Sequence, residues 1–340
     1  MKAIALVSGG LDSALAAKVI ARQGINVVGI NFITPFSPID KISRSFNLRK
    51  FFDNLGIDIM SVNIFDESLE MIKNPKFGLG SNLNPCIDCH ILMLKKAKGL
   101  LERLDASFVI TGEVLGQRPM SQHRHALELI ERKSGLQGLL LRPLSAKLLG
   151  ETIPEKEGWI KRSELFDFSG RSRSPQFALA KELGIKDYQT PAGGCLLTDA
   201  GFSLRMKDLL KHNLKALNNN EIEMLKFGRH FRLGDQIKLV VGRNQEENEK
   251  LLKLARNRDY LFEPQGIPGP VALGRGRFDN KELLNLACRI VSRYSDSQHG
   301  EPVKINLRKK GLGFLGAKEF SCLALDEKTL ENLRVQKAQK

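Results

Sequence analysis

The chain has 340 residues, of which 42% are hydrophobic and 27% are charged, as in an ordinary soluble protein. No apolar run approaches the length of a membrane span, and the first residues lack the basic segment and cleavage site of a signal peptide. The net charge is +15, and residues 201–340 carry 27 Lys and Arg against 17 Asp and Glu. The length predicts two domains or three small ones. The basic half favours a polyanionic partner, with a merely soluble basic surface as the alternative.

The first fourteen residues contain an apolar run, a turn rich in Ser and Gly, and the start of a helical pattern. A buried parallel strand followed by a glycine turn and a helix directs backbone N–H groups toward one anion. Asp12 in this turn is suited to holding Mg²⁺. An ordinary capped helix start is the alternative. The turn residues that we expect to bind a nucleotide and its phosphates are Ser8, Gly9, Gly10, Leu11, Asp12 and Ser13.

The string over residues 8–13, Ser-Gly-Gly-Leu-Asp-Ser, resembles the PP-loop of the ATP pyrophosphatases. That family includes tRNA thiouridine synthases, asparagine synthetases and NAD synthetases. A Walker A pattern does not occur in the chain. The resemblance implies that ATP is cleaved to AMP and pyrophosphate while a substrate carbonyl oxygen is adenylylated. The motif alone does not name the acceptor.

A strand over residues 26–32 follows the first helix and completes a β-α-β unit. A helix is predicted over residues 41–55 and a third strand over residues 58–63. Phe32 stands at the end of the second strand, near the crevice where doubly wound sheets bind ligands. The resemblance implies that Phe32 lies beside the adenine, and core packing is the alternative.

A loop over residues 73–85 leads to a C-x-x-C pattern, Cys86 and Cys89, at the start of a predicted helix. A helix N-terminus lowers thiol pKa values, so these thiolates are candidate nucleophiles, redox partners or metal ligands. A second C-x-x-C is absent, so a four-cysteine zinc ribbon is unsupported. Five cysteines without a disulfide-dense pattern suit a reducing cytoplasm.

A strand beginning at residue 106 ends in Thr111, Gly112 and Glu113. In tRNA thiouridine synthases a strand ending in Thr-Gly-Glu or Thr-Gly-His contributes to the ATP site. The Gly-Gln and Ser-Gln pairs that follow, within residues 116–122, look like the 4-thiouridine branch. A generic strand-end turn is the alternative. Residues 139–144 predict a fifth strand, and the basic segment 168–176 is either a phosphate contact or a solvated loop.

A third cysteine of this half, Cys195, follows two glycines, so its backbone can approach another element closely. Cys86 and Cys195 resemble the two cysteine positions of tRNA 2-thiouridylases, where one thiol is a nucleophile and the other carries sulfur. The added Cys89 departs from that pair. A C-x-x-C with one distant cysteine is similar to PP-loop thiolases that bind a [4Fe-4S] cluster. We therefore expect Cys86, Cys89 and Cys195 to hold a cluster, with a persulfide and disulfide route as the alternative.

The composition changes after residue 207, and residues 226–244 interleave Arg and Lys with apolar residues in a strand-and-turn pattern. A helix over 246–256, an aromatic strand and a Pro-Gly turn follow. This order resembles the NFACT-type RNA-binding domain over residues 235–273. A basic strand face with an aromatic is consistent with RNA contact, and a solvated sheet face is the alternative. Cys288 and Cys322 lie in apolar surroundings and are predicted to be buried. A G-x-G-x-x-G pattern at 311–316 follows a basic polar run over residues 308–310 and precedes no β-α-β unit, so it predicts no dinucleotide site.

The sequence thus predicts a doubly wound, mostly parallel α/β domain over residues 1–200 and a smaller α+β, RNA-binding domain over residues 201–340. The resemblance implies an ATP-dependent tRNA uridine sulfurtransferase that uses ATP, Mg²⁺ and a sulfide or persulfide donor, with Asp12, Cys86 and Cys195 as catalytic residues. The alternatives are a ligase that uses ammonia and an RNA-binding protein with a vestigial ATPase core. The tRNA position, the choice between O2 and O4, the sulfur donor and the oligomeric state do not follow from these residues.

Overall fold

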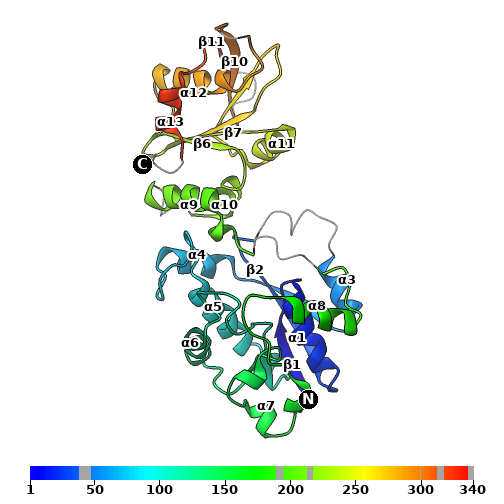
Figure 1. The fold of residues 1–340 in the computed structure, drawn as a ribbon. Coiled ribbons are helices and arrows are strands. Elements are labelled where there is room, and N and C mark those ends of the chain that lie inside the picture. Colours follow the sequence, from blue (N-terminus) through cyan, green and yellow to red (C-terminus); the bar gives the residue numbers. More distant parts are fainter. Residues whose placement is uncertain (38–46, 189–193, 213–216, 299, 312–317, 336–340) are drawn as a thin grey trace. The chain divides into compact units, whose positions relative to one another are not determined.

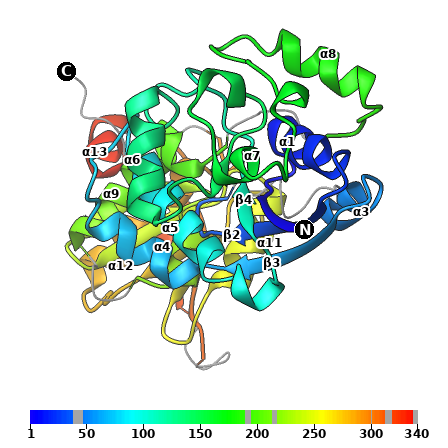
Figure 2. The same cartoon turned by 90° about the horizontal axis from the view of Figure 1, so that it is seen from below.

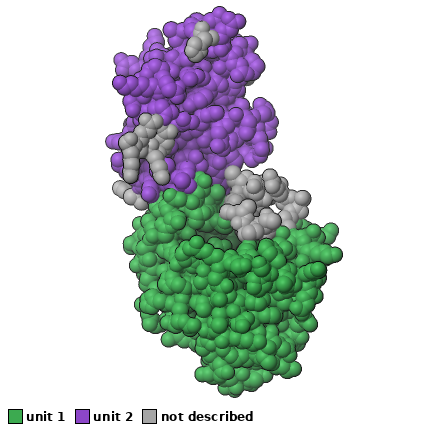
Figure 3. All heavy atoms as spheres, viewed as in Figure 1, with its two compact units in different colours: residues 1–199 green, residues 200–340 purple. Residues whose placement is uncertain are grey.

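The computed structural model describes residues 1–37, 47–188, 194–212, 217–298, 300–311 and 318–335. The chain divides into two compact units, Met1–Asp199 and Ala200–Lys340 (Figure 3). Within the described ranges no helix is both long and apolar enough to span a membrane. Two predicted features fall partly outside those ranges, namely the first part of the helix over 41–55 and most of the glycine pattern at 311–316.

A five-stranded parallel sheet organises the first unit, in the order β3-β2-β1-β4-β5. Its strands are β1 (Lys2–Leu6), β2 (Asn26–Ile33), β3 (Asp58–Asn63), β4 (Phe108–Ile110) and β5 (Leu140–Leu141). β1 pairs in parallel with β2 on one side and with β4 on the other, so the direction of winding reverses at β1. The predicted doubly wound α/β fold is confirmed.

Helices cover both faces of this sheet. Successive side chains of β1 point to opposite faces, so alternate residues of this strand pack against different helices. Ala3 and Ala5 pack in the core that contains α1, α3 and α8, whereas Ile4 packs in the core that contains α5 and α6. Figures 1 and 2 both show α1 beside α8 and α4 beside α5. The helices are α1 (Leu11–Ala21), α3 (Leu48–Asp53), α4 (Phe65–Lys73), α5 (Cys86–Lys98), α6 (Arg124–Ser134), α7 (Ile153–Lys156) and α8 (Ser174–Glu182), with 3-10 turns η1 (Glu102–Leu104), η2 (Ala146–Leu148), η3 (Arg162–Glu164) and η4 (Leu196–Thr198).

The second unit is built on a six-stranded antiparallel sheet in the order β11-β10-β8-β9-β7-β6. Its strands are β6 (Arg229–Gly234), β7 (Ile237–Val241), β8 (Tyr260–Pro264), β9 (Ala272–Arg275), β10 (Val303–Lys309) and β11 (Lys318–Cys322). Its helices are α9 (Ala200–His212), α10 (Asn219–Met224), α11 (Gln245–Leu254), α12 (Lys281–Arg293) and α13 (Glu327–Leu333). The predicted α+β class is confirmed, and Cys288 and Cys322 are buried as expected.

The basic residues interleaved in β6 and β7 do not line an exposed strand face. His230 and Lys238 are buried, and Arg232 pairs with Asp208 of α9. Arg243, just after β7, pairs with Glu247 of α11. The physical reason is that helices contribute carboxylates to this face, so the cations are used inside the unit. The predicted exposed face is therefore wrong for His230 and Lys238.

Candidate active site at the carboxyl edge of the parallel sheet

The carboxyl ends of β1 and β4 lie side by side at the point where the winding reverses, which is where doubly wound sheets bind ligands. β1 leads into the loop over residues 8–13, and β4 leads into Thr111, Gly112 and Glu113. A Cβ atom added to Gly112 would lie 2.5 Å from the carbonyl carbon of Asp12 and 2.6 Å from the nitrogen of Ser13. Only glycine permits this approach, and it brings the two predicted nucleotide-binding segments together.

The loop after β1 is held in a defined shape by its own hydroxyl groups. Ser13 Oγ donates to the Gly10 carbonyl oxygen at 2.9 Å and accepts from the Ser8 N–H at 3.3 Å. Gly9 has a φ of +79°, a conformation that favours glycine. The Leu11 side chain is buried in the core, so a ligand could contact only the backbone of Leu11. This shape is consistent with a cradle for phosphate oxygens at the N-terminus of α1.

Asp12 is bonded through one carboxylate oxygen and leaves the other without a partner. Its Oδ2 accepts from Arg173 Nη2 at 2.7 Å and from Gln117 Nε2 at 2.8 Å. Gln117 in turn accepts at Oε1 from Gln176 Nε2 at 3.0 Å. The Asp12 Oδ1 atom is buried and has no hydrogen-bond partner among the described residues. A buried, unpartnered carboxylate oxygen fits a cation, so Asp12 suits the role of a Mg²⁺ ligand.

Arg173, Gln117 and Gln176 join Asp12 in the candidate site, and the sequence had indicated only the segments that hold them, 116–122 and 168–176. Arg173 belongs to the basic segment for which phosphate contact and a solvated loop were equally open. That segment is anchored by a hydrogen bond from the Gly170 N–H to the Leu115 carbonyl oxygen at 2.7 Å. In the sequence, the signal for this segment was its basic composition just before a helix. The contact between Arg173 and Asp12 could not be read from the sequence, because the two residues are 161 positions apart.

The Glu113 carboxylate points into the protein and is fully bonded there. Its Oε1 shares a hydrogen bond with His90 Nδ1 at 2.7 Å, and its Oε2 accepts from Arg142 Nε and Thr111 Oγ1, each at 3.0 Å. Burial by itself would raise the pKa of Glu113, but the Arg142 guanidinium and the His90 hydrogen bond lower it to about 2. Glu113 thereby ties β4 to α5. Its contact with ATP stays a prediction.

The structure brings the three predicted cysteines together. Cys86 opens α5, and its Sγ accepts from Asn84 Nδ2 at 2.9 Å. The Leu83 N–H donates to the Leu197 carbonyl oxygen at 3.2 Å, which places the segment of Cys195 beside the start of α5. Burial raises the pKa of the Cys89 thiol to about 12, and the nearby sulfurs of Cys195 and Cys86 add to this increase. The three sulfurs therefore share one electrostatic neighbourhood.

A cluster held by Cys86, Cys89 and Cys195 stays a prediction, as does the persulfide route. None of the five cysteines forms a disulfide. Throughout the described part of the chain, no three His, Cys, Asp or Glu side chains form a group that could hold one metal ion. The thiolates that hold a [4Fe-4S] cluster surround a larger body and stand farther apart. Because a metal centre deprotonates the thiols that bind it, the raised pKa of Cys89 does not oppose this assignment.

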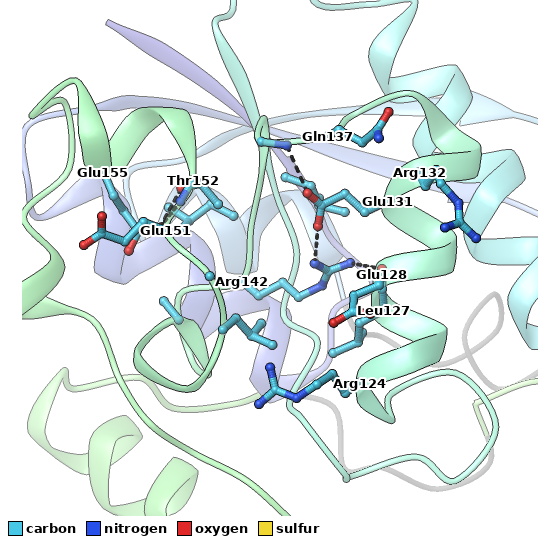
Figure 4. A pocket seen from close by; sticks show the side chains of 16 residues that line it. Arg124, Leu127, Glu128, Glu131, Arg132, Gln137, Arg142, Glu151, Thr152 and Glu155 are labelled. Carbon is cyan, nitrogen blue, oxygen red and sulfur yellow. Dashed lines mark hydrogen bonds and ion pairs between the residues drawn. The ribbon is translucent and has the colours of Figure 1, made fainter.

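Two further features lie outside this group of residues. Phe32 is half-buried and packs with the core on the α5 side of the sheet, so core packing accounts for it and contact with adenine stays a prediction. A cavity of about 410 Å³ opens beside α6 and β5, and none of the predicted site residues lines it (Figure 4). Its buried polar groups are already paired, Arg142 with Glu131 and Thr152 with Glu155. We assign this cavity no role in the chemistry.

Comparisons with known proteins divide along the two units. Residues 1–169 match the family described as thiamine biosynthesis protein (ThiI), and residues 228–321 match the NFACT protein RNA binding domain. The chain is 28% identical over 168 residues to the probable tRNA sulfurtransferase of Thermococcus kodakarensis, a match that covers 49% of this chain and 42% of the relative. It is 31% identical over 88 residues to the tRNA-specific 2-thiouridylase MnmA of Desulfosudis oleivorans, covering 25% of this chain and 24% of the relative. Both resemblances expected from the sequence are confirmed.

The chain thus spans less than half the length of these curated relatives. Among solved structures, a 4-thiouridine synthetase in complex with RNA and bound ATP is similar over 54% of this chain and 51% of that chain. The identity is 21% and the TM-score is 0.36, which is too weak a similarity to support a function.

Proposed function

We propose that the chain is an ATP-dependent tRNA uridine sulfurtransferase. Residues 1–169 match the family described as thiamine biosynthesis protein (ThiI), and residues 228–321 match the NFACT protein RNA binding domain. One observation carries this proposal. Gly112, just after β4, approaches the loop over residues 8–13, and the next residue, Glu113, is joined by a hydrogen bond of 2.7 Å to His90 of α5, the helix that Cys86 opens. An activating nucleotide and a sulfur-bearing group are the two components that thiolation requires. Five cysteines without a disulfide-dense pattern suit action in the cytoplasm.

In the proposed activation step, the backbone N–H groups of the loop and the N-terminus of α1 bind the phosphates of ATP. Asp12 would hold Mg²⁺, which when bound neutralises phosphate charge. Arg173 lies 2.7 Å from Asp12 and would turn to a phosphate oxygen as Asp12 takes the metal. A uracil carbonyl oxygen attacks the α-phosphorus and pyrophosphate leaves. The loop N–H groups stabilise the charge that develops on the leaving pyrophosphate.

In the proposed sulfur step, sulfur attacks the uracil carbon that carries the adenylate, and AMP leaves with the former carbonyl oxygen. Cys86, Cys89 and Cys195 would hold a [4Fe-4S] cluster, which when bound supplies an open iron position for sulfide. In the alternative route, Cys86 or Cys195 carries a persulfide donated by a carrier protein. Its terminal sulfur goes to the uracil, and the second thiol closes a disulfide that a cellular thiol reductant reopens.

The first experiment is an absorption spectrum with iron and sulfide analysis on protein purified without oxygen. We expect a broad band at about 400 nm that is lost in the Cys86→Ala, Cys89→Ala and Cys195→Ala proteins. The Cys288→Ala protein is the matched control, because Cys288 is buried in the core of the second unit. A colourless, iron-free wild type would remove the cluster and favour the persulfide route.

The second experiment separates activation from sulfur transfer with ATP, tRNA and sulfide. We expect Asp12→Ala to lose AMP and thiouridine formation together, by about 100-fold or more. Cys195→Ala should lose thiouridine while it still forms AMP. Formation of AMP with ammonia but never thiouridine would favour the amide-forming ligase. A wild type that binds tRNA but forms no AMP would favour the vestigial ATPase.

A further inference from the structure

The second unit is strongly basic, yet many of its cations are already paired with carboxylates of the same unit. Arg275 pairs with Glu221 and Asp259, and Arg308 pairs with Glu263. Lys304 and Arg293 likewise have carboxylate partners. Net charge therefore does not show where a polyanion binds. The informative cations are those that reach solvent and pair with no carboxylate.

Four such cations gather where the connection before β8 meets the end of β10. The Arg258 N–H donates to the Lys310 carbonyl oxygen at 2.9 Å, and the Lys310 N–H donates to the Asp259 carbonyl oxygen at 2.8 Å. Lys309 pairs across the sheet with Tyr260. Lys318 stands opposite Leu307, two residues before Lys309, so the Lys318 and Lys309 side chains leave the sheet on one face. We call Arg258, Lys309, Lys310 and Lys318 the basic corner.

No carboxylate within the described residues forms a salt bridge with the basic corner. The nearest one along the chain, Asp259, is buried and is bonded to Arg275 at 2.7 Å. Arg258 and Lys318 are exposed, whereas Lys309 and Lys310 are partly so. The corner therefore presents positive charge to solvent that the unit itself does not neutralise.

Arg258 holds its place in a backbone conformation that disfavours it. Its φ is +77°, in the left-handed region. The other described non-glycine residues with positive φ are Asn82, Asp105 and Asp187, whose short polar side chains suit that region. Glycine would fit the Arg258 backbone better, and the exposed guanidinium has no ion-pair partner in the described structure. An arginine in a disfavoured backbone conformation, with no carboxylate partner for its charge, is consistent with a partner outside the chain.

The two lysines beside it limit what the corner can recognise. Lys310 Nζ donates to the Ala255 carbonyl oxygen at 2.7 Å, so it caps α11 and fixes the corner to that helix. Lys309 Nζ lies 5.0 Å from the centroid of the Tyr260 ring, and Phe278 packs on the same ring with centroids 5.1 Å apart. Because Lys309 and Phe278 already pack against the Tyr260 ring, the corner offers charge but no open aromatic ring on which a base could stack.

We propose that the basic corner is the surface through which the second unit binds the phosphate backbone of RNA, with little preference for base sequence. This inference rests on the proposed function. RNA is favoured over other polyanions because all four residues lie in the segment that matches an RNA-binding domain. Phosphate contacts position a nucleic acid, whereas base contacts give sequence preference.

The test measures the affinity of the full chain for an unmodified tRNA transcript by fluorescence anisotropy, from about 50 to about 300 mM salt. The variant is Arg258→Gly with Lys309→Gln, which removes two charges while glycine suits the backbone at 258. Lys310 is left intact because it caps α11. The matched control is Lys281→Gln with Lys328→Gln, two exposed lysines on α12 and α13 that form no ion pair in the described structure.

We expect the corner variant to bind tRNA several-fold more weakly and to lose about 2 from the slope of log affinity against log salt, about 1 for each phosphate contact. The loss should be equal for two RNAs of unrelated sequence, and the melting temperature should be unchanged or higher. An equal loss of tRNA affinity in the control variant would overturn the inference. So would an unchanged salt slope in the corner variant, provided that the wild-type protein binds tRNA.

Two outcomes separate this inference from its premise. A wild type that fails to bind tRNA would contradict the proposed function itself and not only the location of the surface. Loss of binding to phosphatidylglycerol vesicles in the corner variant, with tRNA affinity retained, would assign the corner to a membrane surface and overturn its assignment to RNA.

Discussion

The two units use their poorly exposed charged groups in different places. In the first unit two pairs of such groups lie at the carboxyl edge of the sheet, where Asp12 meets Arg173 and Glu113 meets Arg142. In the second unit they lie between the sheet and the helices that cover it, as in the pairs Arg232–Asp208 and Arg275–Glu221. Figure 1 shows α9, α10 and α11 close to β6 and β7.

The charged groups at the sheet edge of the first unit form a candidate ligand site, whereas those of the second unit hold helices to the sheet. Charges at the ends of parallel strands stand beside loop N–H groups and leave Asp12 Oδ1 without a partner, so the edge retains capacity for a ligand. Charged side chains on a helix-covered face form ion pairs between helix and sheet, so they are not available to a ligand. A basic sequence alone does not distinguish the two, because both uses need the same residue types.

The largest effect is expected where the two loops of the first unit touch. Gly112→Ala would place a Cβ atom 2.5–2.6 Å from three backbone atoms of Asp12 and Ser13. The loop over residues 8–13 must then shift, so we expect loss of ATP binding and a decrease of about 1–3 kcal/mol in the free energy of unfolding. Isothermal titration with ATP and thermal unfolding measure these effects. Gly150→Ala is the control, since nothing lies within 4 Å of its added Cβ; wild-type ATP affinity in Gly112→Ala would contradict the close approach.

An effect on stability, without the direct loss of ATP binding expected for Gly112→Ala, is predicted for the buried pair behind the site. Glu113→Gln leaves the Arg142 guanidinium with Glu131 as its remaining carboxylate, so we expect a loss of about 2–3 kcal/mol at pH 7. Trp159 is the one tryptophan and packs near Phe108 of β4, so its fluorescence reports unfolding of the first unit. Glu128→Gln, on the exposed face of α6, should change stability by less than about 0.5 kcal/mol.

The same variant should change the response to acid. The folded-state pKa of Glu113 lies below its ordinary value of 4.5, at about 2. The stability that the ionised carboxylate contributes is therefore complete above pH 4.5 and is lost as the pH falls toward 2. Denaturant unfolding followed through Trp159 should show wild type and Glu113→Gln converging over that window. A constant difference between them at every pH would rule out this ionisation as the cause.

The smallest effect, and one of opposite sign, is expected in the second unit. Lys238 Nζ is buried, lies 3.9 Å from Asp208 Oδ2 and has no hydrogen-bond partner, and burial lowers its pKa from 10.5 to about 7. The folded state thus releases a proton that the unfolded state keeps between pH 7 and 10.5, so stability should rise with pH across that range. We expect Lys238→Met to stabilise the unit by about 1–2 kcal/mol at pH 7 and to remove that rise.

Hydrogen exchange of the β7 amides as a function of pH measures the effect of Lys238→Met, because it reports on the second unit alone. Lys281→Met, an exposed lysine on α12, is the control for loss of one charge. A less stable Lys238→Met protein at pH 7 would mean that the ammonium has a favourable partner in the folded state.

The sequence by itself determined the features that depend on neighbouring residues. A continuous apolar run and the placement of glycines predicted β1, the loop and α1, and the segment at the C-x-x-C pattern predicted a helix that begins near Cys86. Apolar surroundings predicted the burial of Cys288 and Cys322. These features follow from backbone preferences and side-chain periodicity, which act over a few residues and can be read along the chain.

Only the tertiary structure decided which distant groups meet. It paired Asp12 with Arg173, turned Glu113 inward to Arg142 and His90, and brought Cys195 beside α5. It also buried Lys238 and His230, although their alternation had predicted a strand face in contact with RNA or solvent. The physical reason is that these contacts depend on strand order, register and helix packing, which here join residues 23 to 161 positions apart and leave no local pattern in the sequence.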